Sequence, residues 1–268
     1  MTDLFSPAAA ARSTAANWQP PAGIAPRGTL LILPGRGEHP LVYERFGRRL
    51  SADGYVVHAL DTAPEDGIDD VLARAAEAAG PDPVVPVVLV GSDTGALQAL
   101  HAAAADDPRL TVEGIVIAGT APTGEVARPQ TGEVAEPPTG TAGESAWDTE
   151  LAARTACPTH RKRLSEDQGF VRGQLTAPVP AHLLAAARPD TPALILHGGA
   201  DPVTPPEHAR ELAAGLPRAT LGVLREGLHD VLNDASHRTT AAAVVLWLER
   251  LRADPALHPI LTVETGDL

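Results

Sequence analysis

One short segment carries the residue types best suited to chemistry. The apolar run VPVVLV leads directly into GSDTG at residues 91–95, and a segment rich in Ala, Leu and Gln follows it. This order predicts a buried strand, a tight turn and a helix, the context that a G-x-S-x-G nucleophile turn requires. The two glycines allow a sharp bend and a close approach of the helix. Asp93 stands at the centre of the turn, where the helix dipole favours a carboxylate.

Two other interpretations of this turn remain open at the level of sequence. Aspartate is a preferred N-cap residue, so Asp93 could serve only to begin the helix. Ser92 could be the nucleophile if the motif were shifted by one residue. In the usual geometry, however, the residue before the central one points away from the pocket. Residues further along the chain therefore have to decide between these interpretations.

Two later residues have the types and the order that would complete a catalytic triad. Asp201 lies in a Gly-rich turn after the apolar run ALILH, and His229 lies in the loop after ATLGVL. Open α/β sheets place their sites at the carboxyl ends of the strands, so these side chains are expected near Asp93. The order nucleophile, acid, histidine is the order known for this kind of site. We predict Asp93, Asp201 and His229 as the catalytic residues.

The elements that must position these residues alternate regularly between short apolar runs and longer helical segments. This alternation is typical of an α/β fold with a mostly parallel sheet and helices on both faces. Continuous Val, Ile and Leu runs indicate strands that are buried on both sides. We expect strands at residues 28–33, 55–60, 85–90, 112–118, 193–197 and 219–224, and helices at 42–52, 69–79, 95–105, 206–215 and 237–252.

The alternation stops between residues 121 and 190. The segment begins with the near-repeats TGEVARPQ, TGEVAEPP and TGTAGESA, which indicate a flexible, low-complexity loop. Long insertions into compact domains are usually functional or disordered, so we interpret this one as a lid, with a surface excursion as the alternative. The predicted organisation is a leader over residues 1–27, a core over 28–120 and 191–268, and a lid or cap over 121–190.

Composition excludes several classes of function. The net charge is −13 and aromatic residues make up 3% of the chain, which argues against binding to nucleic acid or to anionic membrane surfaces. No apolar stretch is long enough to span a membrane. The N-terminus lacks the features of a signal peptide, and the single Cys157 fits a reducing compartment, so we expect a cytoplasmic protein. No motif predicts a metal or another cofactor.

Three segments resemble the α/β-hydrolase family of monoacylglycerol lipases and lysophospholipases. LLILPGRGEHPLVYERFGRRLSADGYVVHALD resembles that family's HGxGEH oxyanion segment, the elbow follows, and LHGGADPVTPP with EGLHDVLNDASHRTTAAAVVLWLE closes the site. The resemblance implies an α/β-hydrolase fold and an oxyanion hole formed by the backbone N–H groups of Arg36 and Thr94. It also implies His229 as general base and Asp201 as its orienting acid. Two residues depart from the family: Pro34 replaces a histidine, and Asp93 replaces the serine.

The aspartate leaves the reaction open between two hydrolytic chemistries. Ester or lactone hydrolysis keeps the substrate class of the family, and Asp93 would then form a mixed anhydride or direct water onto the carbonyl. Attack at a saturated carbon keeps the usual chemistry of a carboxylate nucleophile and passes through an alkyl-enzyme ester, as in dehalogenases of this fold. Epoxide hydrolases of this fold use two tyrosines of the lid to protonate the epoxide oxygen. Epoxide opening is disfavoured here because the two tyrosines, Tyr43 and Tyr55, both precede the elbow.

A small-molecule substrate is expected in either case. We predict Trp147, His160 and Arg161 as substrate-binding residues, because Trp147 and His160 could hold a halide and the basic run at residues 160–163 could attract an anion. The alternative for this run is a solvated helix face. Two other function classes also stay open: a non-catalytic relative that binds a small molecule, and a lyase or isomerase that transfers protons between Asp93 and His229.

Overall fold

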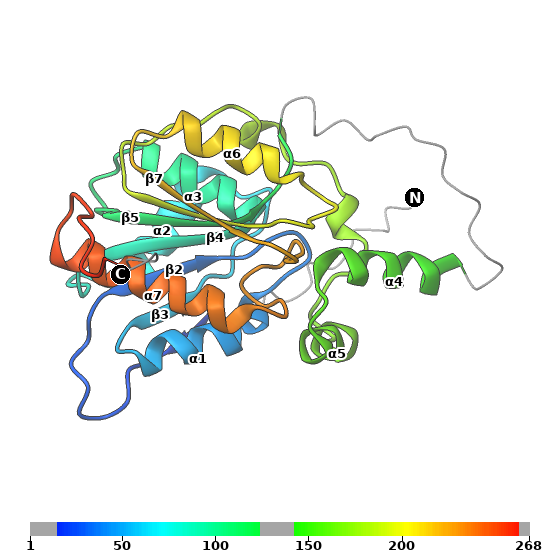
Figure 1. Cartoon of the computed structure of the whole chain (residues 1–268), viewed down its shortest axis with the longest axis horizontal. Coiled ribbons are helices and arrows are strands. Elements are labelled where there is room, and N and C mark those ends of the chain that lie inside the picture. Colours follow the sequence, from blue (N-terminus) through cyan, green and yellow to red (C-terminus); the bar gives the residue numbers. More distant parts are fainter. Residues whose placement is uncertain (1–14, 124–141, 263–268) are drawn as a thin grey trace, which may run out of the picture.

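The computed structural model describes residues 15–123 and 142–262, which contain one seven-stranded sheet (Figure 1). The strand order is β1-β3-β2-β4-β5-β6-β7, and every neighbouring pair is parallel except the antiparallel pair β1–β3. The strands are β1 Ala16–Trp18, β2 Thr29–Leu33, β3 Val56–Ala59, β4 Val87–Asp93, β5 Gly114–Thr120, β6 Ala193–Gly198 and β7 Ala219–Leu224.

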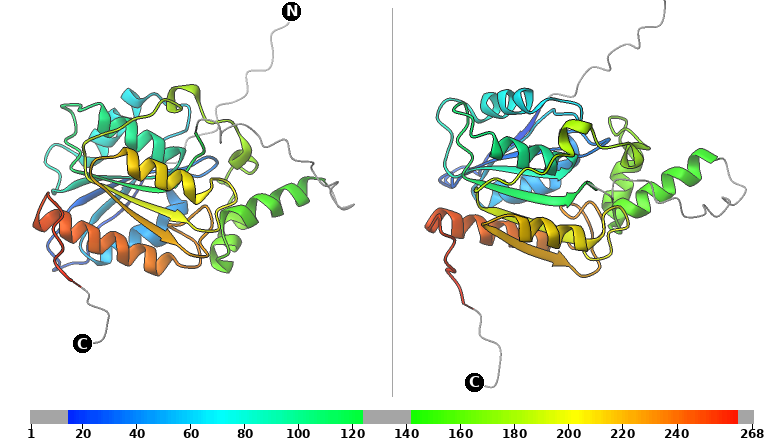
Figure 2. Two further views of the ribbon diagram at one scale, coloured as in Figure 1. Left: turned by 45° about the horizontal axis from the view of Figure 1, so that its top comes forward. Right: turned by 90° about the horizontal axis from the view of Figure 1, so that it is seen from above.

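Helices cover both faces of this sheet, as Figures 1 and 2 show. One face packs against α1 (Glu44–Ala52), which follows the short helix η1 (Pro40–Tyr43), and against α7 (His237–Ala253). The other face packs against α2 Ile68–Ala79, α3 Thr94–Ala104 and α6 Pro206–Gly215. Strands β2, β4, β5 and β6 are buried along their whole length, which explains their unbroken apolar sequences.

The predicted fold class is confirmed, and each predicted strand and helix is found with its ends shifted by a few residues at most. One further strand, β1, was not predicted; it lies within residues 1–27, which the sequence suggested as a leader. Residues 16–18 form an edge strand beside β3, with Ala16 opposite Ala59. Three residues are too few for a periodic pattern, so only the partner strand defines this element.

The insertion between β5 and β6 is helical where it is described. It contains α4 (Ala142–Arg154), α5 (Pro158–Glu166) and the short helices η3 (Gln174–Thr176) and η4 (Ala181–Leu183). In both views of Figure 2, α4 projects from the body of the molecule. The near-repeats lie mostly in residues 124–141, outside the described residues. Among the helices of the described part, none is long and apolar enough to cross a membrane.

Candidate active site

The turn between β4 and α3 has the strained geometry of a nucleophile elbow. Asp93 ends β4 with φ 52° and ψ −117°, a conformation that is costly for any residue other than glycine. A Cβ atom on Gly91 would lie 2.2 Å from the carbonyl oxygen of Gly95, and one on Gly95 would lie 2.1 Å from that of Leu33. Glycine is therefore required at both positions for the strand and the helix to approach each other.

The structure brings Asp93, Asp201 and His229 together in one hydrogen-bonded chain. The Nδ1 atom of His229 lies 2.8 Å from Asp201 Oδ2, and its Nε2 atom lies 3.3 Å from Asp93 Oδ1. Asp201 follows β6 and His229 follows β7, so the carboxyl ends of three parallel strands supply the three side chains. All three residues are buried.

The two alternative interpretations of the elbow find no support in this geometry. The side chain of Asp93 makes no capping hydrogen bond to α3. The hydroxyl of Ser92 interacts with the hydroxyl of Tyr43. Because both ring nitrogens of His229 face carboxylates, the imidazole is directed to Asp93 and not to Ser92.

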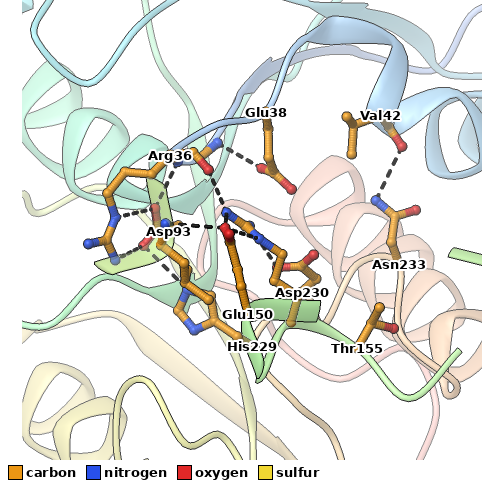
Figure 3. A network of polar contacts seen from close by, with 12 residues as sticks. Arg36, Glu38, Val42, Asp93, Glu150, Thr155, His229, Asp230 and Asn233 are labelled. Atoms are coloured by element: carbon orange, nitrogen blue, oxygen red, sulfur yellow. Dashed lines mark hydrogen bonds and ion pairs between the residues drawn. The ribbon is translucent and has the colours of Figure 1, made fainter. Parts of the chain in front are cut away.

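The side chain of Arg36 is the component of the site that the sequence interpretation missed. Its backbone N–H and its Nε each donate to Asp93 Oδ2 at 2.8 Å, and its Nη2 donates to Oδ1 at 2.8 Å (Figure 3). The family resemblance assigned only the backbone of this residue to the site. The signal in the sequence was the combination of a basic residue in the oxyanion segment with an acidic residue at the elbow, which could form an ion pair.

One of the two predicted oxyanion-hole donors therefore binds a carboxylate of the protein itself. The N–H of Arg36, which was expected to face a substrate oxygen, donates to Asp93. Thr94 is fully buried at the start of α3, and its hydroxyl has no hydrogen-bond partner among the described residues. The oxyanion role of Arg36 and Thr94 stays a prediction.

Electrostatics fix the charges of this cluster. Both ring nitrogens of His229 have a carboxylate acceptor, which requires a proton on each. Burial opposes this charge, but the attraction of Asp201 and Asp93 outweighs burial and raises the pKa of His229 to about 10. Burial likewise opposes the charge of Asp93, but Arg36 and His229 hold its pKa well below the usual value. Two carboxylates and two cations thus form a neutral buried group.

Arg154 at the end of α4 ties the insertion to both loops of this cluster. Its fully buried guanidinium donates to the carbonyl oxygen of Arg36 at 2.7 Å and to Glu150 Oε1 at 3.0 Å. It also lies 3.4 Å from Asp230 Oδ1. In the backbone, the N–H groups of His229 and Asp230 donate to the carbonyl oxygens of Ala153 and Arg154. Figure 3 shows Glu150 and Asp230 beside Arg36 and His229.

The segment after α5 closes against the same oxyanion loop. The N–H of Val171 donates to the carbonyl oxygen of Gly37 at 2.9 Å, and Arg36 Nη1 donates to the carbonyl oxygen of Ala177 at 2.6 Å. A hollow of about 320 Å³ lies beside Arg36, between this segment and residues 61–65. Asp93 is not among the residues that line this hollow, but Arg36 lines it and binds the Asp93 carboxylate.

The predicted substrate-binding residues lie in the insertion but have protein partners. His160 is buried and its Nε2 lies 3.2 Å from Asp230 Oδ2. Arg161 donates to the carbonyl oxygen of Thr155. The half-buried Trp147 packs against Phe170 with a centroid distance of 5.6 Å, and the guanidinium of Arg172 stacks on its ring. No hydrogen bond or ion pair joins any of these three described residues to Asp93, and their binding role stays a prediction.

The family profile described as "Serine aminopeptidase, S33" matches residues 24–236, most of the chain. The chain belongs to this family of α/β hydrolases. The resemblance inferred from the oxyanion, elbow and histidine segments is thereby confirmed at the level of the family and fold. No curated protein matches the chain.

Several solved hydrolase structures share this fold. A monoacylglycerol lipase of Paleococcus ferrophilus is 22% identical with a TM-score of 0.61, and the match covers 88% of this chain and 97% of the lipase. A monoglyceride lipase of Saccharomyces cerevisiae is 16% identical with a TM-score of 0.63, covering 88% and 90%. The type II thioesterase YbtT of yersiniabactin biosynthesis is 19% identical with a TM-score of 0.55, covering 87% and 97%.

The buried cation of His229 predicts a loss of stability at alkaline pH. Its pKa is raised from 6.5 to about 10, so its contribution is complete below pH 6.5 and is lost as the pH rises toward 10. Relative to His229→Gln, the wild type should lose up to about 1.4 kcal/mol of unfolding free energy per pH unit in this window. Urea unfolding at several pH values measures this. The variant His182→Gln, at an exposed position, should lose unfolding free energy with pH as steeply as the wild type. An equally steep loss in His229→Gln would contradict the assignment of the buried cation to His229.

The buried network predicts that Arg154 is essential for stability. Arg154→Met leaves the carboxylates of Glu150 and Asp230 buried without their cation and should cost about 3–5 kcal/mol of unfolding free energy. The exposed Arg238→Met removes the same charge from the surface and should cost less than about 0.5 kcal/mol. Denaturant titration of both variants measures the difference, and equal costs would refute the role given to Arg154.

Proposed function

We propose that this chain hydrolyses a small organic substrate, with Asp93 as nucleophile, His229 as the group that activates water and Asp201 as its orienting acid. The observation that supports the proposal is the hydrogen-bonded chain Asp93–His229–Asp201, which starts from a strained elbow residue. Strain of this kind persists where the surrounding structure holds it, and it is concentrated at functional sites. The family of the chain supports a hydrolase.

The protonation state favours attack at a saturated carbon as the first step. His229 carries a proton on both nitrogens while Asp93 is ionised, so in the resting site His229 is not available as the base that activates water. A carboxylate needs no base to displace a leaving group. Oδ1 of Asp93 attacks the carbon, the carbon–halogen bond breaks, and the halide leaves with the bonding electrons. The guanidinium Nη2 of Arg36, which lies 2.8 Å from Oδ1, has to move aside for the substrate.

The second step uses the same groups in a different charge state. Esterification removes the negative charge of Asp93, so one of the two carboxylates that raise the pKa of His229 is lost. His229 releases its Nε2 proton to solvent and can then accept a proton from water. The water oxygen adds to Cγ of Asp93 while the N–H of Arg36 holds Oδ2. The ester bond breaks, the product alcohol takes a proton, and one carboxylate oxygen of Asp93 now comes from water.

Ester or lactone hydrolysis is the second candidate. Family membership favours it, and a monoacylglycerol lipase and a thioesterase share the fold. In this chemistry Asp93 attacks the carbonyl carbon, the alcohol leaves, and water hydrolyses the resulting mixed anhydride. The N–H of Arg36 would have to transfer from Asp93 to the substrate oxygen.

Isotope labelling tests the nucleophile directly. After turnover of short primary haloalkanes in ¹⁸O-water, mass spectrometry of the peptide that contains Asp93 should show ¹⁸O in its carboxylate. Asp93→Ala should reduce halide release by at least about 10³-fold, because the covalent step is lost. The exposed Asp190→Ala should keep wild-type turnover. An aryl ester hydrolysed without label in Asp93 would point to direct water attack. Folded protein that turns over neither substrate class would contradict the hydrolase proposal and favour a non-catalytic binder.

The charge state also predicts an unusual pH profile. Asp93 stays ionised and His229 stays protonated across the neutral range, so kcat/KM for haloalkanes should be constant from about pH 5 to 9. A serine hydrolase with a neutral histidine would instead show a rise near pH 7. Initial rates at constant ionic strength measure the profile, and such a rise would contradict the charge assignment.

A further inference from the structure

A second hollow lies on the side of the sheet that α3 and α6 cover. Its volume is about 270 Å³, enough for about nine water molecules at roughly 30 Å³ each. Apolar side chains form most of its wall: Leu97, Leu100, Leu183, Leu212 and Leu216. Water in such a space gains few hydrogen bonds from leucine, so a partly apolar occupant is favoured over water alone.

Two residues that line the hollow each carry a buried polar atom with no hydrogen-bond partner among the described residues. The hydroxyl of Thr120, a residue 1% exposed, makes no hydrogen bond to any described residue, and neither does Nε2 of His101. A third polar group, Nε2 of His208, faces the hydroxyl of Thr123 at 3.3 Å. Leaving a buried donor or acceptor unpaired costs free energy, so these atoms point to a ligand that carries a hydrogen-bonding group.

The charges around this cavity restrict the ligand further. Arg188 and Glu211 are its charged lining residues, and both are exposed. The wall also offers the buried hydroxyl of Thr120 and the half-buried imidazoles of His101 and His208. Burial lowers the pKa of His208, so that imidazole is neutral at pH 7. A charged ligand group placed among these leucines would lose its hydration without a buried counter-charge.

The cavity is distinct from the candidate active site. Asp93, Asp201, His229 and Arg36 do not line it. It nevertheless reaches the strand next to the one that ends at Asp93, because Thr120 of β5 is the register partner of Asp93 in β4.

We propose that this cavity binds a small uncharged amphiphile, such as an alcohol of about six to eight carbons. Its alkyl chain lies along the leucines, and its hydroxyl pairs with the free hydroxyl of Thr120. This site goes beyond the proposed hydrolysis, because no catalytic residue takes part in it.

Titration of the full chain with hexan-1-ol, followed by NMR or calorimetry, tests the site. Binding with a Kd on the order of 1 mM is expected for so small a ligand. Leu212→Trp fills the cavity and should abolish binding, whereas Leu246→Trp on the exposed side of α7 should not. If Leu212→Trp does not fold, Leu184→Trp at an exposed position of the same wall replaces it.

A second variant tests the hydrogen bond between the ligand and Thr120. Thr120→Val keeps the shape and removes the unpaired hydroxyl, so hexan-1-ol should bind about fivefold more weakly while the Tm does not fall. Hexan-1-ol binding is measured without any hydrolysable substrate, so its outcome is independent of the hydrolysis experiments. Hexanoate binding as tightly as hexan-1-ol, or unchanged binding in the tryptophan variant, would overturn the proposal.

Discussion

The ion pair between Arg36 and Asp93 is the interaction on which the site depends. Both side chains are almost fully buried, and three N–H groups of one residue bind the carboxylate of the other. Taking a single charge out of water costs several kcal/mol, so neither residue is stable here without its partner. The same balance extends to His229 and Asp201, because the imidazolium requires both carboxylates. The four residues therefore form one electrostatic unit in which each buried charge is compensated by a neighbouring opposite charge.

This unit explains why the insertion is a fixed part of the site. The carbonyl oxygen of Arg36 accepts from Arg154 of α4, and the backbone of His229 is held by the end of the same helix. Arg36 also donates to Ala177, beyond α5. The described part of the insertion thus holds both the oxyanion loop and the histidine loop. The buried Arg154 of this insertion supports the site, and removing the insertion would leave Asp230 without its arginine partner.

The closed arrangement also constrains the chemistry. A serine at the elbow would leave the oxyanion N–H free for a substrate and the histidine neutral, whereas an aspartate recruits both. The carboxylate is consequently a group whose charge must disappear before His229 can act as a base. Covalent attack at carbon removes that charge in its first step, so the resting structure and the proposed reaction fit each other.

The sequence by itself determined the α/β-hydrolase fold, the elbow and the order of Asp93, Asp201 and His229 along the chain. These features are local: continuous apolar runs, glycines at a tight turn and polar residues just after strands. Only the tertiary structure decided the partners of these residues. Arg36 lies 57 positions from Asp93 and Arg154 lies 118 positions from Arg36, and no periodicity connects such distant side chains. The edge strand at residues 16–18 likewise exists only through β3. A charge needs a nearby opposite charge only once it is buried, and burial is a property of the folded chain.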